Sequence, residues 1–545
     1  MDVFLKIIIG FLLFFTPFAF AGAEPWGFSV LQGGVVLCWA LLLFSRRRLI
    51  FSSVFKPVFF TLAFLIVLTL VQLCFPKTLL DPVAAYPVTL MPLYSWEHIS
   101  LFITYLAVAA LVPQLYRSQE DVSKLLFWMV MSTVAVALCF VCLPNGDYIF
   151  YFTGLRAGIG PFLNRNHAAM FFVLGALVTL GVFFMGQLHA SKIVSHRQKN
   201  AFYIRQICLF AVFAGLCVAA VMTRSRGGML SLLVGIFCYS FLCTWAVPHQ
   251  LRRKLKGFFI TLIFLLLSAG WIYTHVEDIN AFAHRATGAS AETRKMMYRS
   301  AEKILTQRPV WGIGVGAMPV VITSYVEWPM NAYIERLHND WLEILLGVGC
   351  AGAIPIVWGV LWFIWLALKR LKRLEVRKQF LFAALLSALV AMSTGSTVDF
   401  HFFIPANAYL FFLLLGSVCA ATYAKHHIHE IPLKWWLRAL ILVVLCLSLY
   451  VPTQKTRAWR CVVFGRGYKT VAKLAQYEQS VAYYPSPRYA VRLGNAYFNA
   501  SLRADTPQEK ADLRAKGFNI ATTYLRRYPK EKELSRLYLR THPRR

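Results

Sequence analysis

The hydrophobic positions of this chain fall into long runs that short polar segments separate. Each run has about 17–25 residues, the length that an α-helix needs to cross the hydrocarbon core of a bilayer. Because backbone groups in lipid must bond within their own segment, repeated runs of this length predict an all-α, polytopic bundle. The alternating pattern of a membrane β-barrel is absent. We therefore expect 12–13 transmembrane helices, at residues 4–21, 27–44, 58–75, 98–115, 125–142, 166–186, 206–222, 229–247, 257–274, 343–368, 379–397, 404–423 and 435–452.

Composition supports this fold class. Of the 545 residues, 58% are hydrophobic, whereas soluble domains have about 45–50%. The net charge of +32 would suggest nucleic-acid binding in a soluble protein, but no DNA- or RNA-binding motif accompanies it, so we expect no nucleic acid partner. The cysteines lie almost entirely inside apolar runs, which indicates packing and predicts neither a disulfide framework nor a metal site.

Lysine and arginine follow alternate spans, which predicts the orientation of the bundle. The positive-inside rule places all of these clusters on the cytoplasmic side if the N-terminus is cytoplasmic. "FAFAGAE" at 18–24 resembles a signal-peptide cleavage site, but we favour an uncleaved first helix. The loop 275–342 and the chain after 452 are then extracytoplasmic. The basic clusters are Arg46 to Arg48 with Lys56, Arg117 with Lys124, Lys192 with Arg197 and Lys199, Arg252 to Lys256, "KRLKRLEVRK" at 369–378, and Lys425 with Lys434.

Two extracytoplasmic parts are too large to be simple connections. Within 275–342 the sequence predicts a helix at about 291–306 with Ser290 as candidate N-cap, followed by the glycine-rich turn "GIGVG". This turn lacks the strand, helix and lysine of a nucleotide site. Composition changes again after the membrane domain 1–452. The tail 453–545 contains helical units near two "YP" steps that resemble tetratricopeptide hairpins. Its basic excess predicts contact with lipid headgroups or polysaccharide, or only a solvated face.

Arginines close to predicted spans are the first candidates for chemistry. Arginine near hydrocarbon is costly unless it is paired or hydrated. Arg224 and Arg226 precede one span and Arg165 precedes another, all on the extracytoplasmic side. A guanidinium group stays charged and fits phosphate with a planar fork of donors, so converging arginines predict a site for a lipid diphosphate. The alternative is that these arginines are interfacial anchors.

Polar residues at the same predicted level supply the rest of the candidate site. His338 can accept a proton from a sugar hydroxyl or bind phosphate, while "HND" also resembles a helix start with Asn339 or Asp340 as cap and Glu343 near capping-box spacing. Asn164, Asn166 and His167 have the same two interpretations, ligand binding or capping. Asp399 is interpreted as the partner of an arginine rather than as a base.

Five segments together resemble the bacterial O-antigen ligase and polymerase superfamily across about residues 150–420. They are "FLNRNHAA", "SRGGML", "PVWGIGVG", "HNDWLEILLGVGCAG" and "VDFHFFIPANA", in this order. The resemblance implies an inner-membrane glycosyltransferase without cofactor or metal, with a periplasmic active site and a glycan on undecaprenyl diphosphate as donor. The family's functional positions map onto Arg226, Arg294 and His338 as catalytic residues. The remaining candidates are substrate contacts, namely Arg224, Arg165, Asn164, Asn166, His167, Asn339 and Asp399.

Several activities share this donor chemistry. The first choice is an inverting ligase that moves the glycan onto lipid A-core or a similar acceptor. A polymerase that joins repeat units and a protein O-oligosaccharyltransferase are the alternatives, and a helical tail that recruits an acceptor or an envelope-assembly partner fits either. A flippase or a non-enzymatic scaffold belongs to another class. A transporter predicts ionisable residues deep inside spans, whereas here the polar residues gather at one face.

Overall fold

The computed structural model places the predicted spans on helices. It describes residues 1–46, 48–76, 86–143, 149–150, 155–156, 160–187, 195–247, 256, 258–260, 262–263, 289–325, 334–421, 428–467, 470–528 and 532–542. Twelve expected spans coincide with helices, and the span at 257–274 lies mostly outside the described residues. Within the described residues, ten helices are long and apolar enough to cross a membrane. The helices of the bundle are α1 (Asp2–Phe18), α2 (Pro25–Ser45), α3 (Phe55–Cys74), α4 (Pro92–Leu115), α5 (Gln119–Cys142), α6 (Arg165–Gln187), α7 (His196–Met222), α8 (Arg226–Ala246), α13 (Asp340–Leu371), α14 (Val376–Gly395), α15 (Pro405–Ala421) and α16 (Trp435–Ser448).

Several helices begin before the apolar run that predicted them. α4 starts at Pro92 rather than near 98, α5 at Gln119 rather than near 125, and α7 at His196 rather than near 206. Hydropathy marks only the apolar stretch of each helix, whereas helix geometry extends through the polar first turns. For α5 the start is fixed by Ser118, whose hydroxyl accepts a hydrogen bond from the Asp121 N–H at 3.0 Å.

α6 and α14 pack against each other and are buried along most of their length. Small residues bring these helices close to their neighbours. A Cβ atom at Gly181 of α6 would lie 2.3 Å from the Ala384 Cβ of α14, and one at Gly175 would lie 2.3 Å from the Thr133 hydroxyl of α5. Such close approach is the usual basis of helix packing inside a membrane. α16 has most of its surface exposed, as expected for a helix at the lipid boundary.

One end of the bundle carries several of the basic segments that predicted the orientation. Arg46 forms an ion pair with Asp2 at 2.5 Å and Lys6 one with Asp121 at 2.5 Å, which ties the start of α1 to the end of α2 and the start of α5. Strands β1 (Arg48–Ser52) and β4 (Ile428–Pro432) pair antiparallel at this end. The starts of α6, α8 and α13 lie at the other end.

The second end carries the part of the long loop that the structure describes. This part of the loop contains α11 (Ala289–Gln307), α12 (Met318–Val321) and the 3₁₀ turn η3 (Ile322–Ser324). The remaining short elements, η1 (Phe20–Gly22), β2 (Ile149–Phe150) and β3 (Leu155–Arg156), lie elsewhere in the chain. The predicted helix at 291–306 is therefore present. The expected cap is wrong, because Ser290 lies inside α11 rather than before it.

The "GIGVG" segment fills a break in α13. Gly349 has φ +62° and interrupts the helix, and the freed groups pair with the segment 309–314. Ile313 N–H donates to the Leu346 carbonyl at 2.9 Å, and Cys350 N–H donates to the Pro309 carbonyl at 2.8 Å. A Cβ atom at Gly312 would lie 2.3 Å from the Leu346 carbonyl oxygen, so only glycine permits this approach. The break inside a predicted span is thus satisfied by protein groups, as lipid requires.

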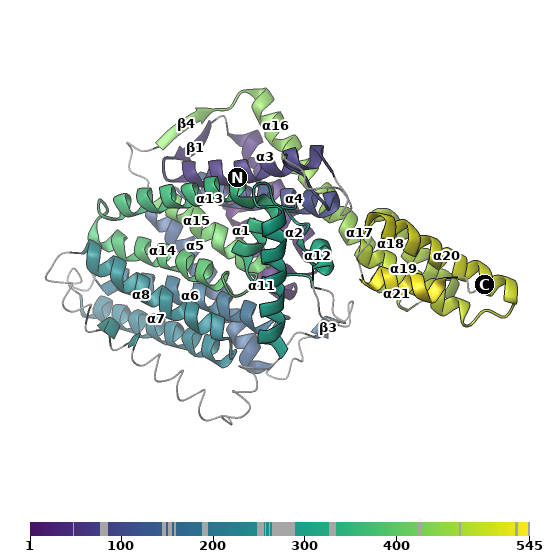
Figure 1. Ribbon diagram of the computed structural model, residues 1–545. Coiled ribbons are helices and arrows are strands. Elements are labelled where there is room, and N and C mark those ends of the chain that lie inside the picture. Colours follow the sequence, from purple (N-terminus) through teal and green to yellow (C-terminus); the bar gives the residue numbers. More distant parts are fainter. Residues whose placement is uncertain are drawn as a thin grey trace.

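The tail is helical, as predicted, and projects from the bundle (Figure 1). Its helices pack in chain order, each against the next. Residue 452 lies in the first turn of α17, which packs against α2 and α4 of the bundle. The tail helices are α17 (Tyr450–Gly465), α18 (Thr470–Tyr483), α19 (Pro487–Ser501), α20 (Pro507–Arg527) and α21 (Lys532–Thr541).

Candidate functional site

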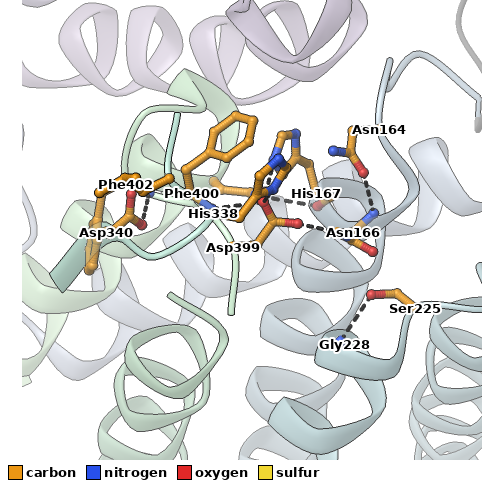
Figure 2. Close-up of polar contacts among 12 residues, drawn as sticks. Asn164, Asn166, His167, Ser225, Gly228, His338, Asp340, Asp399, Phe400 and Phe402 are labelled. Atoms are coloured by element: carbon orange, nitrogen blue, oxygen red, sulfur yellow. Dashed lines mark hydrogen bonds and ion pairs between the residues drawn. The ribbon is translucent and has the colours of Figure 1, made fainter. Parts of the chain in front are cut away.

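Three helices begin next to one another at the site, each with a side-chain cap. Figure 2 shows the caps of two of them, α6 and α8. The Asn164 side chain accepts from the Asn166 N–H at 2.9 Å before α6, and Ser225 accepts from the Gly228 N–H at 3.0 Å in α8. Asn339 accepts from the Leu342 N–H at 3.0 Å in α13. The capping interpretation of Asn339 is therefore confirmed. Helix N-termini carry partial positive charge, so this end of the bundle favours an anion.

Glu343 does not complete the capping box that its spacing suggested. Its carboxylate turns away from the cap, accepting from the Leu337 N–H at 3.4 Å and from Arg336 at 2.6 Å. Burial acts to lower the pKa of Arg336, but the charge of the Glu343 carboxylate and its hydrogen bond to the guanidinium outweigh this effect and raise the pKa. The pair holds the residues immediately before His338.

Asp399, in the turn between α14 and α15, is the centre of the cluster (Figure 2). Its Oδ1 atom lies 2.9 Å from His338 Nδ1 and accepts from the Phe400 N–H at 2.9 Å. Its Oδ2 atom accepts from the Asn166 amide. His167 Nε2 lies 3.8 Å from Oδ1, an electrostatic contact rather than a hydrogen bond. The sequence predicted an arginine partner, and these imidazole and amide partners were not anticipated.

The surroundings of Asp399 keep it ionised. Burial opposes its charge, but contacts with the imidazoles of His167 and His338 outweigh this effect and hold its pKa well below the usual range. An ionised Asp399 accepts the Nδ1–H of His338, which leaves Nε2 of the same ring as a proton acceptor. The side chain of Asp399 is 1% exposed and that of His338 is 29% exposed, so the acid is buried while the imidazole is accessible.

The backbone at His338 adopts a conformation that few residues of this size take. Its φ is +55°, in the left-handed region, and Arg224 at the start of the neighbouring helix has φ +58°. The Tyr298 hydroxyl donates to the His338 carbonyl at 3.3 Å, which joins α11 to the site. Strained backbone that surrounding contacts maintain is common where side chains must point in one direction.

Arg294 lies one helical turn before Tyr298 in α11. Burial raises the pKa of Tyr298, and the positive charge of Arg294 partly opposes this shift. Arg294 is thus within electrostatic range of a residue that contacts His338. The structure thus places Arg294 near the site through α11.

Arg226 is the first residue of α8. The first turn of α8 packs against α6 and against the turn that contains Asp399. A Cβ atom at Gly227 would lie 3.0 Å from Val398, next to Asp399, and one at Gly228 would lie 2.5 Å from Ala169 of α6. The Arg226 side chain is exposed. Exposed Arg224 lies just before α8, and exposed Arg165 begins α6. The backbone of Arg226 is therefore adjacent to the Asp399 turn.

Sequence reasoning missed four residues of the cluster. Phe400 packs edge-on against the rings of His338 and His167, at 5.0 and 4.7 Å between centroids. Asn407 donates to the His167 carbonyl at 3.1 Å. His401 lies beside His167, and Tyr298 binds the backbone of His338. The segment "VDFHFFIPANA" signals three of them, because His and Asn are rare beside such apolar positions.

We expect acid to destabilise the protein through His401. Burial lowers its pKa to about 3, with a smaller effect from His167. Since the unfolded histidine titrates near 6.5, stability is full above that pH and falls as pH drops toward 3, by about 2 kcal/mol between pH 7 and 5. Thermal unfolding in detergent measures this loss. His401→Gln should flatten the pH dependence, and an unchanged slope would contradict it.

No metal site is evident in the described part of the chain. No three His, Cys, Asp or Glu residues there converge as metal ligands do. Cys139 and Cys142 in α5 have C-x-x-C spacing, and both are free thiols. The cluster around Asp399 is thus built from hydrogen bonds and charge.

Residues 210–357 match the family model of the O-antigen ligase. The matched segment includes Arg224, Arg226, Arg294, His338 and Asn339, whereas Asn166, His167 and Asp399 lie outside it. A comparison with curated proteins found no match. Over residues 210–357 the chain is therefore similar to the O-antigen ligase family, and its long apolar helices are those of a membrane protein.

Proposed function

We propose that this chain, whose residues 210–357 match the O-antigen ligase family model, transfers a glycan from undecaprenyl diphosphate to an acceptor hydroxyl. The acceptor in this proposal is lipid A-core or a similar molecule. The observation that carries the proposal is the buried, ionised Asp399 on Nδ1 of the accessible His338. That arrangement suits a histidine that must receive a proton from a sugar hydroxyl.

The reaction we propose is a single displacement. The acceptor O–H gives its proton to His338 Nε2 while its oxygen bonds to the anomeric carbon. The bond from that carbon to the diphosphate oxygen breaks, and undecaprenyl diphosphate leaves with the electron pair. Attack opposite the leaving group inverts the anomeric configuration. Cleavage of the bond between the sugar and the diphosphate supplies the driving force, so this scheme needs no nucleotide.

In the same scheme arginines stabilise the departing diphosphate. Arg226 and Arg294 bind its oxygens, with Arg224 and Arg165 as further contacts. Charge developing on the leaving group then meets fixed guanidinium groups and the N-termini of α6, α8 and α13. Exposure of Arg224, Arg226 and Arg165 at one end of the bundle supports this assignment.

The polar residues around Asp399 have a supporting role in the proposal. The side-chain oxygens of Asn164 and Asn339 already accept backbone N–H groups, and the Asn166 amide is held by Asp399. Their remaining amide groups and His167 would contact the sugar or phosphate. Most of their contribution is to hold the helix starts in place.

We propose the bacterial inner membrane as the location, with the N-terminus in the cytoplasm and the site and tail in the periplasm. Support comes from the two ends of the bundle. The basic residues Arg46 and Arg48 gather with Lys6 at one end, and His338 lies at the other. The positive-inside rule assigns the first end to the cytoplasm.

Deletion of the gene tests this proposal against its alternatives. We expect full-length glycan to accumulate on the lipid carrier, measured by extraction of lipid-linked glycans and mass spectrometry. Single unpolymerised repeats on the carrier would instead indicate a polymerase, and loss of glycosylated protein would indicate a protein oligosaccharyltransferase. An unchanged set of lipid-linked glycans would contradict all three.

A further inference from the structure

The tail and the loop that carries His338 share one hydrophobic core. A single buried cluster includes Ile334 and Leu337, which precede His338, together with Met297 and Ala301 of α11. Residues of the tail belong to the same cluster, among them Ala458, Val462, Tyr484, Tyr489 and Val491. A tail connected to the bundle only through the last span would share no such core with the loop. The first tail helices thus pack directly against the segment that carries His338 and against α11.

Tyr484, between α18 and α19, makes the most buried polar contact across this junction. It is 2% exposed, and its hydroxyl donates to the carboxylate of Glu97 near the start of α4. Lys455 of α17 forms an ion pair with the same carboxylate at 2.8 Å. Two tail residues therefore share one carboxylate of the bundle.

The contact continues from α4 toward His338. His98, next to Glu97, packs against the Phe403 ring at 5.2 Å, and the Arg336 guanidinium lies 3.6 Å from the centre of that ring. Arg336 pairs with Glu343, which also accepts the Leu337 N–H. These contacts form a continuous path from α4 to Leu337, the residue that precedes His338.

A second connection reaches the same segment over the surface. Arg488 at the start of α19 forms an ion pair with Glu335 at 2.7 Å. Both side chains are largely exposed, so this pair is worth much less than the buried contact. Its value lies in its position, because it joins the tail to the residue three places before His338.

We infer that tail helices α17–α19 position residues 334–338, so that the tail belongs to the catalytic unit, with Tyr484 as the main positioning residue. The effect on glycan transfer rests on the proposed function, but the effect on His338 itself does not. The tail would thus orient the His338 imidazole, besides recruiting any partner.

The test measures the reactivity of His338 directly in the purified full-length protein. Diethyl pyrocarbonate modifies accessible neutral imidazoles, and peptide mass spectrometry gives the rate at His338, with exposed His196 at the opposite end as internal reference. We expect Tyr484→Phe to change this rate about tenfold, since a buried hydrogen bond to a charged group is lost. Glu335→Arg and Arg488→Glu should each change it by about threefold.

Two controls separate positioning from general damage to the tail. The double variant Glu335→Arg with Arg488→Glu restores the ion pair and should return the rate to that of the wild type. Leu537→Ala in α21 removes an equally buried side chain, 1% exposed, that does not belong to the cluster shared with Ile334 and Leu337, and it should leave the rate unchanged. Wild-type rates in Tyr484→Phe and both single charge reversals would overturn the inference. Altered His338 reactivity with unaltered glycan transfer would support it and contradict the proposed function.

Discussion

Replacing His338 with alanine should lower the rate of glycan transfer by about 10²–10⁴, the usual contribution of a general base. The imidazole is held by Asp399 Oδ1 at 2.9 Å from Nδ1, so its accessible nitrogen has a fixed direction. The proposed scheme gives the proton of the acceptor to His338 alone. The measurement is transfer of lipid-linked glycan by the purified variant, with acceptor and donor both saturating.

Asp399→Asn provides the matched test of the same pair. An asparagine keeps the size of the side chain but removes the charge that stabilises a protonated His338, so we expect a loss of similar order. Asp121→Asn is the control, because this aspartate also forms an ion pair but lies at the opposite end of the bundle. Full activity in both His338→Ala and Asp399→Asn would exclude a histidine base.

Replacing Arg226 with alanine should lower the rate by about 10²–10³, the cost of removing one preorganised donor to developing negative charge. The effect should fall mainly on kcat if the guanidinium binds the leaving diphosphate more tightly than the substrate. Arg226→Lys should recover part of the loss, because lysine keeps the charge but lacks the planar fork.

Arg373→Ala is the control for charge alone. Arg373 is also exposed, but it follows α13 at the basic end of the bundle. It should leave transfer unchanged. Equal activity of the Arg226→Ala and wild-type proteins, or an equal loss in Arg373→Ala, would contradict a specific diphosphate contact.

The membrane fold could be predicted from the sequence because lipid imposes a single strong requirement. A run of apolar residues must form a helix in lipid, so twelve spans coincide with helices, and their residue ranges differ mainly where polar first turns extend them. The cap Asn339 is local too, since its side chain binds the N–H three residues later. Such contacts depend on a few neighbouring residues only.

The contacts that make the site were harder to predict because they join distant segments. Asp399 meets His338 across 61 residues and Asn166 across 233. The sequence places these residues on one side of the membrane but does not reveal which pairs form, so an arginine was assigned to Asp399. The "GIGVG" turn is a similar case, because its partner is the broken part of α13. The capping-box spacing at Glu343 misled for another reason, since tertiary contacts with Arg336 took the carboxylate away.

We propose that a lipid diphosphate binds where α6, α8 and α13 begin. A structure of the full-length protein with undecaprenyl diphosphate in a nanodisc tests this most directly. We expect the phosphates to lie within hydrogen-bond distance of the Arg226 and Arg294 guanidinium groups, with His338 Nε2 facing the space for the acceptor. Phosphates bound at the opposite end, against the basic residues 369–378, would contradict it.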